Sequence, residues 1–123
     1  MPESAIPAVV INLINHNPKT DEVTLVLVET ERWGKAPDVL DRLRAKLDGY
    51  VRFVVSGQFA RDYPALAGKR VRFRIDCHHP VGVKEIAFLY KYRSEELETR
   101  GIVLDMHEVG VRSFLKRTFR KKY

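Results

Sequence analysis

The chain has 123 residues, 45% of them hydrophobic and 31% charged, with a formal net charge of +6. This composition is typical of one globular domain and excludes a low-complexity or fibrous protein. No run of 18 apolar residues occurs, and residues 1–10 lack the pattern of a signal peptide, so we expect a cytoplasmic protein without a membrane span. The single cysteine, Cys77, forms no internal disulfide, in keeping with a reducing compartment.

Two apolar runs rich in β-branched residues predict the first two strands, at residues 8–14 (AVVINLI) and 22–30 (EVTLVLVET). The turn residues between them, 16–21, predict an antiparallel hairpin. Residues 25–28 are apolar without alternation, which places the second strand inside the sheet.

Residues 37–57 predict the central helix, because apolar residues recur three and four positions apart. Pro37 suits the first helical turn, and Gly57 suits the left-handed position after the last. Gly49 leaves an alternative open, in which residues 50–55 (YVRFVV) form a strand. The predicted buried stripe consists of Leu40, Leu43, Leu47, Tyr50 and Val54.

Residues 59–68, broken by Pro64 and Gly68, predict a loop before the third strand at residues 69–77. In that strand an apolar residue alternates with an arginine, so one face belongs to the core and the other faces water. The apolar set is Val71, Phe73 and Ile75, and the arginine row is Arg70, Arg72 and Arg74.

Residues 81–100 predict a second helix that ends at Gly101, and residues 102–107 predict a fourth strand with Ile102, Leu104 and Met106 on its core face. The inward residues expected for this helix are Val83, Ile86, Ala87, Tyr90 and Leu97.

The order ββαβαβ predicts an α/β fold on the border of α+β. Right-handed crossovers place both helices on one face, which gives a two-layer sandwich. We expect a four-stranded mixed sheet in the order 1-2-3-4, with strand 1 antiparallel to the rest. Residues 1–110 form this single domain, and residues 111–123 form a separate basic tail.

Several features resemble a small bacterial domain family of unknown function. They are Trp33 before the first helix, residues 46–58 (KLDGYVRFVVSGQ), the Tyr63–Pro64 pair, and the strand, helix and strand that follow. The resemblance covers about residues 9–109 and implies no activity, cofactor or catalytic residue. It favours a continuous helix across Gly49.

Enzyme motifs such as a glycine-rich phosphate loop or a nucleophile elbow are absent from the sequence, and we expect no cofactor and no catalytic residue. The carboxyl ends of parallel strands are the usual ligand site of such sheets. Our topology places Trp33, Cys77, Glu108 and three histidines there. A metal-dependent or hydrolytic enzyme that uses His78, His79 and His107 is therefore the alternative to a binding module, although adjacent histidines seldom bind one ion.

The arginine row is a candidate for gripping phosphates, as sheet-face binders of nucleic acid do. Asp76 and Asp105 share the predicted face and can pair with the row across strands. We therefore favour an ion-paired surface over a binding surface.

All the excess positive charge lies in the tail, which has six cations and no carboxylate side chain. Val111, Phe114, Leu115 and Phe119 stand at helical spacing, so the tail is a disordered end, a helix docked on the open sheet face, or an arm for an anionic surface. We expect weak, sequence-independent nucleic-acid or polyanion binding, with membrane lipid as a lesser candidate and a protein partner as an open alternative. The sequence does not indicate an oligomeric state. The tail cations are Arg112, Lys116, Arg117, Arg120, Lys121 and Lys122.

Overall fold

The computed structural model describes residues 13–30, 32–33, 38–109 and 116–120 of the chain. The described part contains five strands and three helices, so the predicted four strands and two helices are too few. The strands are β1 (Leu13–Asn17), β2 (Glu22–Glu29), β3 (Arg70–Cys77), β4 (Val103–Glu108) and β5 (Lys116–Phe119). The helices are α1 (Val39–Val55), α2 (Gln58–Asp62) and α3 (Val83–Tyr92); α3 continues through a π-helical turn (Arg93–Leu97) and a 3₁₀ turn (Glu98–Arg100).

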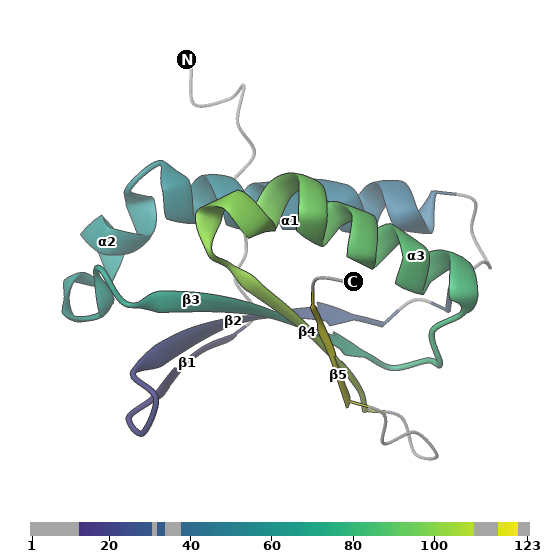
Figure 1. The fold of residues 1–123 in the computed structure, drawn as a ribbon, viewed down its shortest axis with the longest axis horizontal. Coiled ribbons are helices and arrows are strands. Elements are labelled where there is room, and N and C mark those ends of the chain that lie inside the picture. Colours follow the sequence, from purple (N-terminus) through teal and green to yellow (C-terminus); the bar gives the residue numbers. More distant parts are fainter. Residues whose placement is uncertain (1–12, 31, 34–37, 110–115, 121–123) are drawn as a thin grey trace.

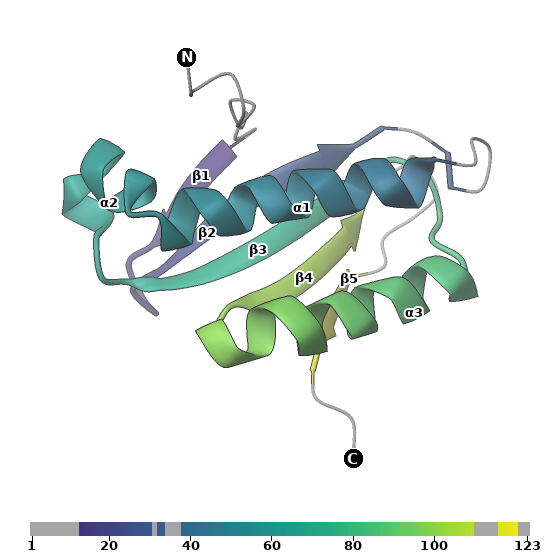
Figure 2. The ribbon, with the colours of Figure 1, turned by 90° about the horizontal axis from the view of Figure 1, so that it is seen from above.

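The sheet has the order β1-β2-β3-β4-β5. Strands β2, β3 and β4 run parallel, while β1 and β5 are antiparallel to their neighbours. Both long helices lie on one face of the sheet, and α1 passes over β2 while α3 lies beside β4 and β5 (Figures 1 and 2). The predicted two layers, the order of the first four strands and the antiparallel first strand are confirmed.

Helix α1 runs without a break through Gly49, so residues 50–55 are helical. The middle of the predicted stripe is buried, and Leu40 and Val54 lie at its half-buried margins. Tyr50 fixes the helix to the sheet, because its hydroxyl donates a 2.7 Å hydrogen bond to the Val26 carbonyl while its ring meets Phe73 edge-on. Gly57 ends the helix at φ 89°, the left-handed position predicted for it.

The inward face predicted for α3 is partly wrong. Val83 is 86% exposed and Ala87 is exposed, whereas Leu89 and Tyr92 are buried. These residues all lie in the regular helix, where Glu85, Leu89 and Tyr92 form the buried stripe at spacings of four and three, so the predicted stripe was out of phase there. The π-helical turn that follows keeps Leu97, five residues after Tyr92, buried as predicted.

Two interactions join α1 to α3. The Tyr92 hydroxyl donates a 2.7 Å hydrogen bond to Asp48, and the Arg44 guanidinium lies over the rings of Phe88 and Tyr92. Burial, followed by this contact with Asp48, raises the pKa of Tyr92. The charged residues of α1 therefore fasten the helical layer as well as solvating it.

The segment 59–68, predicted as a loop, contains α2 and a 3₁₀ turn (Pro64–Leu66). Phe59 is buried and its ring packs against Phe53 and Tyr63. Aromatic packing on the end of α1 thus makes this connection part of the helical layer.

A helix is wrong for the described part of the tail. Lys116–Phe119 forms β5, which pairs antiparallel with β4. The ring of the buried Phe119 meets Tyr90 of α3 with the centroids 4.8 Å apart. The segment KRTF alternates polar and core-facing positions, and β4 offers it a free edge, so period two prevails over helical spacing. Residues 111–115 and 121–123 lie outside the described residues.

Candidate anion-binding site

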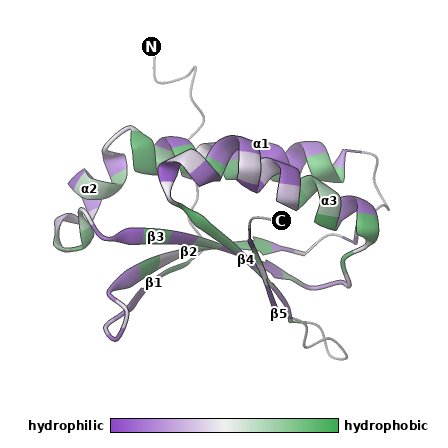
Figure 3. Ribbon diagram, in the orientation of Figure 1, coloured by the Kyte–Doolittle hydropathy of each residue, from purple (hydrophilic) through white to green (hydrophobic). Residues whose placement is uncertain are grey.

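Polar and apolar residues alternate along β3 (Figure 3). The buried apolar residues face the helices, so the arginine row lies on the opposite face of the sheet. Arg72 donates a 2.8 Å hydrogen bond to Asp105 and lies 3.5 Å from Glu22. The hydroxyl of Thr118 on β5 also donates to Asp105, at 2.7 Å. Asp105 is only 8% exposed, so this group of ions is well screened from water.

Arg74 pairs with Asp76 on its own strand through contacts of 2.8 and 3.2 Å. The predicted ion-paired surface is therefore confirmed for Arg72 and Arg74. Arg70 differs, because it is exposed and has no ion pair within the described residues. It lies at the amino end of the sheet, the end at which β2, β3 and β4 begin.

Two hollows flank the start of β4 at this amino end, and Gly101, Ile102 and Val103 form the ridge that they share. The larger hollow has a volume of about 580 Å³ and the smaller one about 380 Å³. Their ionic lining has six cations and two carboxylates. The larger hollow contributes Lys69, Arg70, Arg100 and Glu22, and the smaller one contributes Arg72, Arg93, Arg120 and Glu98.

Most of these cations are held by a carboxylate. Arg93 lies 3.1 Å from Glu98, and Arg100 is 3.9 Å from Glu96 while donating to that residue's carbonyl oxygen. Arg70 and Arg120 have no ion pair in the part of the chain that the structure describes. The two hollows therefore combine positioned cations with unneutralised positive charge.

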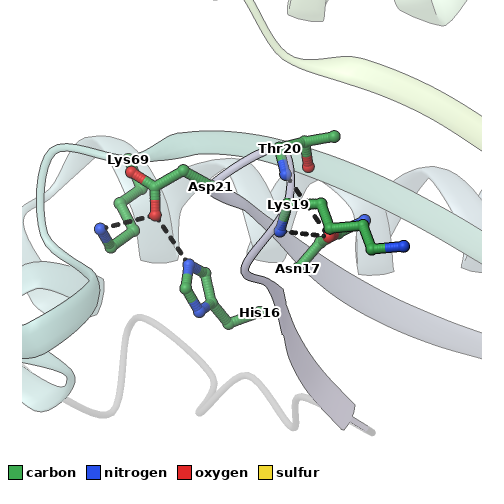
Figure 4. Close-up of polar contacts among 6 residues, drawn as sticks. All are labelled: His16, Asn17, Lys19, Thr20, Asp21 and Lys69. Carbon is green, nitrogen blue, oxygen red and sulfur yellow. Dashed lines mark hydrogen bonds and ion pairs between the residues drawn. The ribbon is translucent and has the colours of Figure 1, made fainter.

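Lys69 is placed by the β1–β2 hairpin turn, as Figure 4 shows. The Asp21 carboxylate accepts 2.8 Å contacts from Lys69 and from the His16 ring, and these two hydrogen bonds lower the pKa of Asp21. The Asn17 side chain accepts from the backbone N–H groups of Lys19 and Thr20, which shapes the turn. The hairpin therefore supports one wall of the larger hollow.

The carboxyl end of the sheet is built differently. Glu29, Cys77 and Glu108 are neighbours across β2, β3 and β4, and all three are buried. Glu108 accepts a 3.0 Å hydrogen bond from the backbone N–H of Val81, just before α3, and Glu29 lies 3.7 Å from Lys46. Burial, and then the charge of Glu29, raises the pKa of Cys77 to about 12. A thiol with this pKa is protonated at neutral pH and is a poor nucleophile or ligand.

The histidines of the predicted metal site do not converge. His107 pairs in register with Asp76 and Lys116 on the open face, whereas Cys77 and Glu108 face the helices. His78 is exposed after the end of β3, and His79 is half-buried. Within residues 13–30, 32–33, 38–109 and 116–120 no group of three potential ligands is placed to hold a metal ion.

The described tail cations divide between the two faces. Lys116 belongs to the open face, while Arg117 turns toward the helices, where it donates a 3.4 Å hydrogen bond to the Tyr90 hydroxyl. Arg120 reaches the smaller hollow. The other predicted tail cations, Arg112, Lys121 and Lys122, lie outside the described residues.

Sequence reasoning missed Lys69, Arg93 and Arg100 as members of this site. Lys69 precedes the arginine row by one residue, so the row itself was a signal for it. Arg93 and Arg100 flank the turn that leads into β4, and only the topology brings that turn beside the start of β3.

The fold defines an α+β two-layer domain with a mixed five-stranded sheet. The chain belongs to a family of unknown function (DUF6572), whose family model matches residues 4–110. This match confirms the resemblance to an uncharacterised family, and β5 lies beyond it. No curated protein and no solved structure matches the chain. In the described residues, no helix has the length and apolar character needed to cross a membrane.

Proposed function

We propose that this domain is a binding module that holds a nucleic-acid strand by its phosphates at the amino end of the sheet, without reading sequence. The observation that carries the proposal is that two adjoining hollows bring together Arg70 and Arg120, which have no ion pair within the described residues, and four further cations that carboxylates hold in place. Arginine and lysine side chains are the usual partners of phosphate oxygens.

The composition of the lining supports recognition of the backbone. Its arginines and its lysine can bind phosphate oxygens of any sequence, and among the described residues both hollows lack the amide side chains that read adenine edges. Arg120 brings one tail cation to the site, while Lys116 lies on the open face toward the other end of β4 and Arg74 is held by Asp76. Cations in such numbers give affinity that depends on salt rather than on sequence.

Charge reversal at the two cations without an ion pair tests this proposal. We expect Arg70→Glu with Arg120→Glu to weaken binding of a labelled random oligonucleotide by about tenfold or more at low salt. The log–log salt slope should become shallower by about 0.7 to 0.9 for each phosphate that is no longer neutralised. Fluorescence anisotropy across a salt series measures both quantities.

Lys84→Glu is the matched control, because Lys84 is also exposed but begins α3 at the opposite end of the sheet. Each single substitution lowers the net charge by two, so Lys84→Glu matches Arg70→Glu or Arg120→Glu taken singly, and a carboxylate in the first helical turn is tolerated. Equal losses in the control and the double variant would show a general charge effect and contradict the site. Absence of binding by the wild type at low salt would point to a protein partner instead.

A further inference from the structure

We infer that the larger hollow receives an unpaired nucleobase, so that single strands are the ligand of the site proposed above; this inference rests on that proposed function. We call the aliphatic part of this hollow's lining, which comes from three elements, the apolar floor. Its residues are Val54 and Val55 of α1, Val71 of β3, and Ile102 and Val103 at the start of β4.

Phosphate binding alone leaves this floor without a role. Val55 is 53% exposed, so water contacts part of this apolar lining in a hollow that cations also line. Covering that lining releases the water and is favourable in proportion to the apolar area covered. A nucleotide matches both parts, since its phosphate is anionic and the faces of its base are largely apolar.

The volumes of the two hollows agree with a base in the larger one and a phosphate in the smaller one. At about 580 Å³ the larger hollow lies within the range of pockets that hold small organic ligands. The smaller one, about 380 Å³, is flanked by Arg72, Arg93 and Arg120 and suits the next phosphate along a strand.

The ridge between the hollows allows a backbone to pass. Gly101 adopts φ 69°, and a Cβ added there would meet no atom within 4 Å, so the space beside this residue is open. In a duplex the bases are stacked and paired inside, out of reach of the apolar floor. A single strand can place one base in the larger hollow and continue across Gly101.

The test compares three labelled ligands of equal length by fluorescence anisotropy: a thymidine single strand, a strand of abasic sites with the same number of phosphates, and a duplex. We expect the wild type to bind the thymidine strand about threefold or more tightly than the abasic strand, because only the former covers the apolar floor. The duplex should bind no more tightly than the thymidine strand.

Val55→Asn should remove most of this preference while leaving the abasic strand unaffected. Val83 is an exposed valine at the other end of the molecule, so Val83→Asn should change the affinity for neither ligand. Val103→Thr replaces a methyl group by a hydroxyl with little change of shape and should produce a smaller loss of the same kind. An unchanged unfolding midpoint in each variant excludes a loss of fold.

Equal binding of thymidine and abasic strands by the wild type would overturn the base pocket and leave the phosphate site standing. Tighter binding of the duplex would overturn it as well. If none of the three ligands binds at low salt, the proposed function itself fails. A competition experiment tests the remaining alternative. If poly-glutamate releases the bound strand more readily than free oligonucleotide does, the occupant is an acidic protein segment and the inference is wrong.

Discussion

The two faces of the sheet share the same strands but are held in different ways. On the helix-facing side, Val23, Phe73 and Leu104 exclude water by packing beneath α1 and α3. On the opposite side, Arg72 and Asp105 are screened from water although no helix covers them in the described structure. One face relies on apolar burial. The other relies on ion pairs that link β2, β3 and β4, and on the Thr118 hydrogen bond that adds β5.

This difference bears on where the proposed binding site lies. A cation that a carboxylate fixes on this face contributes to the sheet: Arg72 is held across strands by Asp105, and Arg74 is held by Asp76 on its own strand. The ion pairs become incomplete toward the amino end, where Arg70 begins β3 and has no ion pair among the described residues. The open face therefore grades from an ion-paired surface at its centre to the proposed binding site at one end.

The largest expected effect is on the packed face. Leu47 is fully buried in the middle of α1, so Leu47→Ala should lower the free energy of unfolding by about 2 to 5 kcal/mol through reduced burial and a cavity. Chemical denaturation measures this change. Val83→Ala is the control, because its side chain is mostly exposed and should cost little. An unchanged midpoint for Leu47→Ala would mean that α1 presents another face to the sheet.

The next effect tests whether ion pairs hold the open face. Asp105→Asn keeps the size of the side chain but removes the charge that faces Arg72, and it weakens the hydrogen bond from Thr118. We expect a loss of about 2 kcal/mol, limited because Arg72 keeps Glu22 as a partner. Thermal or chemical unfolding gives the value.

Asp38→Asn is the matched control for this prediction. Asp38 is exposed and lies 3.8 Å from Arg42 one helical turn away, so its loss should cost less than about 0.5 kcal/mol. Similar losses in the two variants would show that the open face gains no more from its ion pairs than an exposed helix does. The contrast between the two faces would then fail.

Much of this contrast was visible in the sequence. Alternation in residues 69–77 predicted both the core face of β3 and the arginine row, and Asp105 was identified as a partner for that row. The hairpin, the continuous α1 and the parallel crossovers also followed from periodicity and turn residues, because these signals are local.

The remainder depends on contacts between distant segments. β5 became a strand because β4 offered it an edge and Tyr90 packed on Phe119, although its residues also fit helical spacing. The hollows bring the start of β3 beside the turn before β4 and the end of α1, so their cations share no sequence motif. Long-range pairing of this kind cannot be inferred from one sequence without the fold.

The smallest expected effect uses pH to separate the two faces, since the packed face should respond little to titration. His107 lies on the open face, and burial, followed by the charge of Arg74, lowers its pKa below the ordinary value of 6.5; Lys116 acts in the same direction, while Asp76 and Asp105 oppose it. Below pH 6.5 the unfolded chain therefore binds more protons at this residue than the folded chain does.

The contribution of His107 to stability is accordingly complete above pH 6.5 and is lost as the pH falls from 6.5 toward the folded pKa. His107→Gln stays neutral throughout, so its free energy of unfolding should fall less than that of the wild type between about pH 8 and about pH 5.5. Urea denaturation at both pH values gives the comparison. His16→Gln is the control, because that ring lies in the exposed hairpin turn against Asp21. Parallel pH profiles for wild type and His107→Gln would show that the open face admits a proton without cost and is less firmly held than its ion pairs indicate.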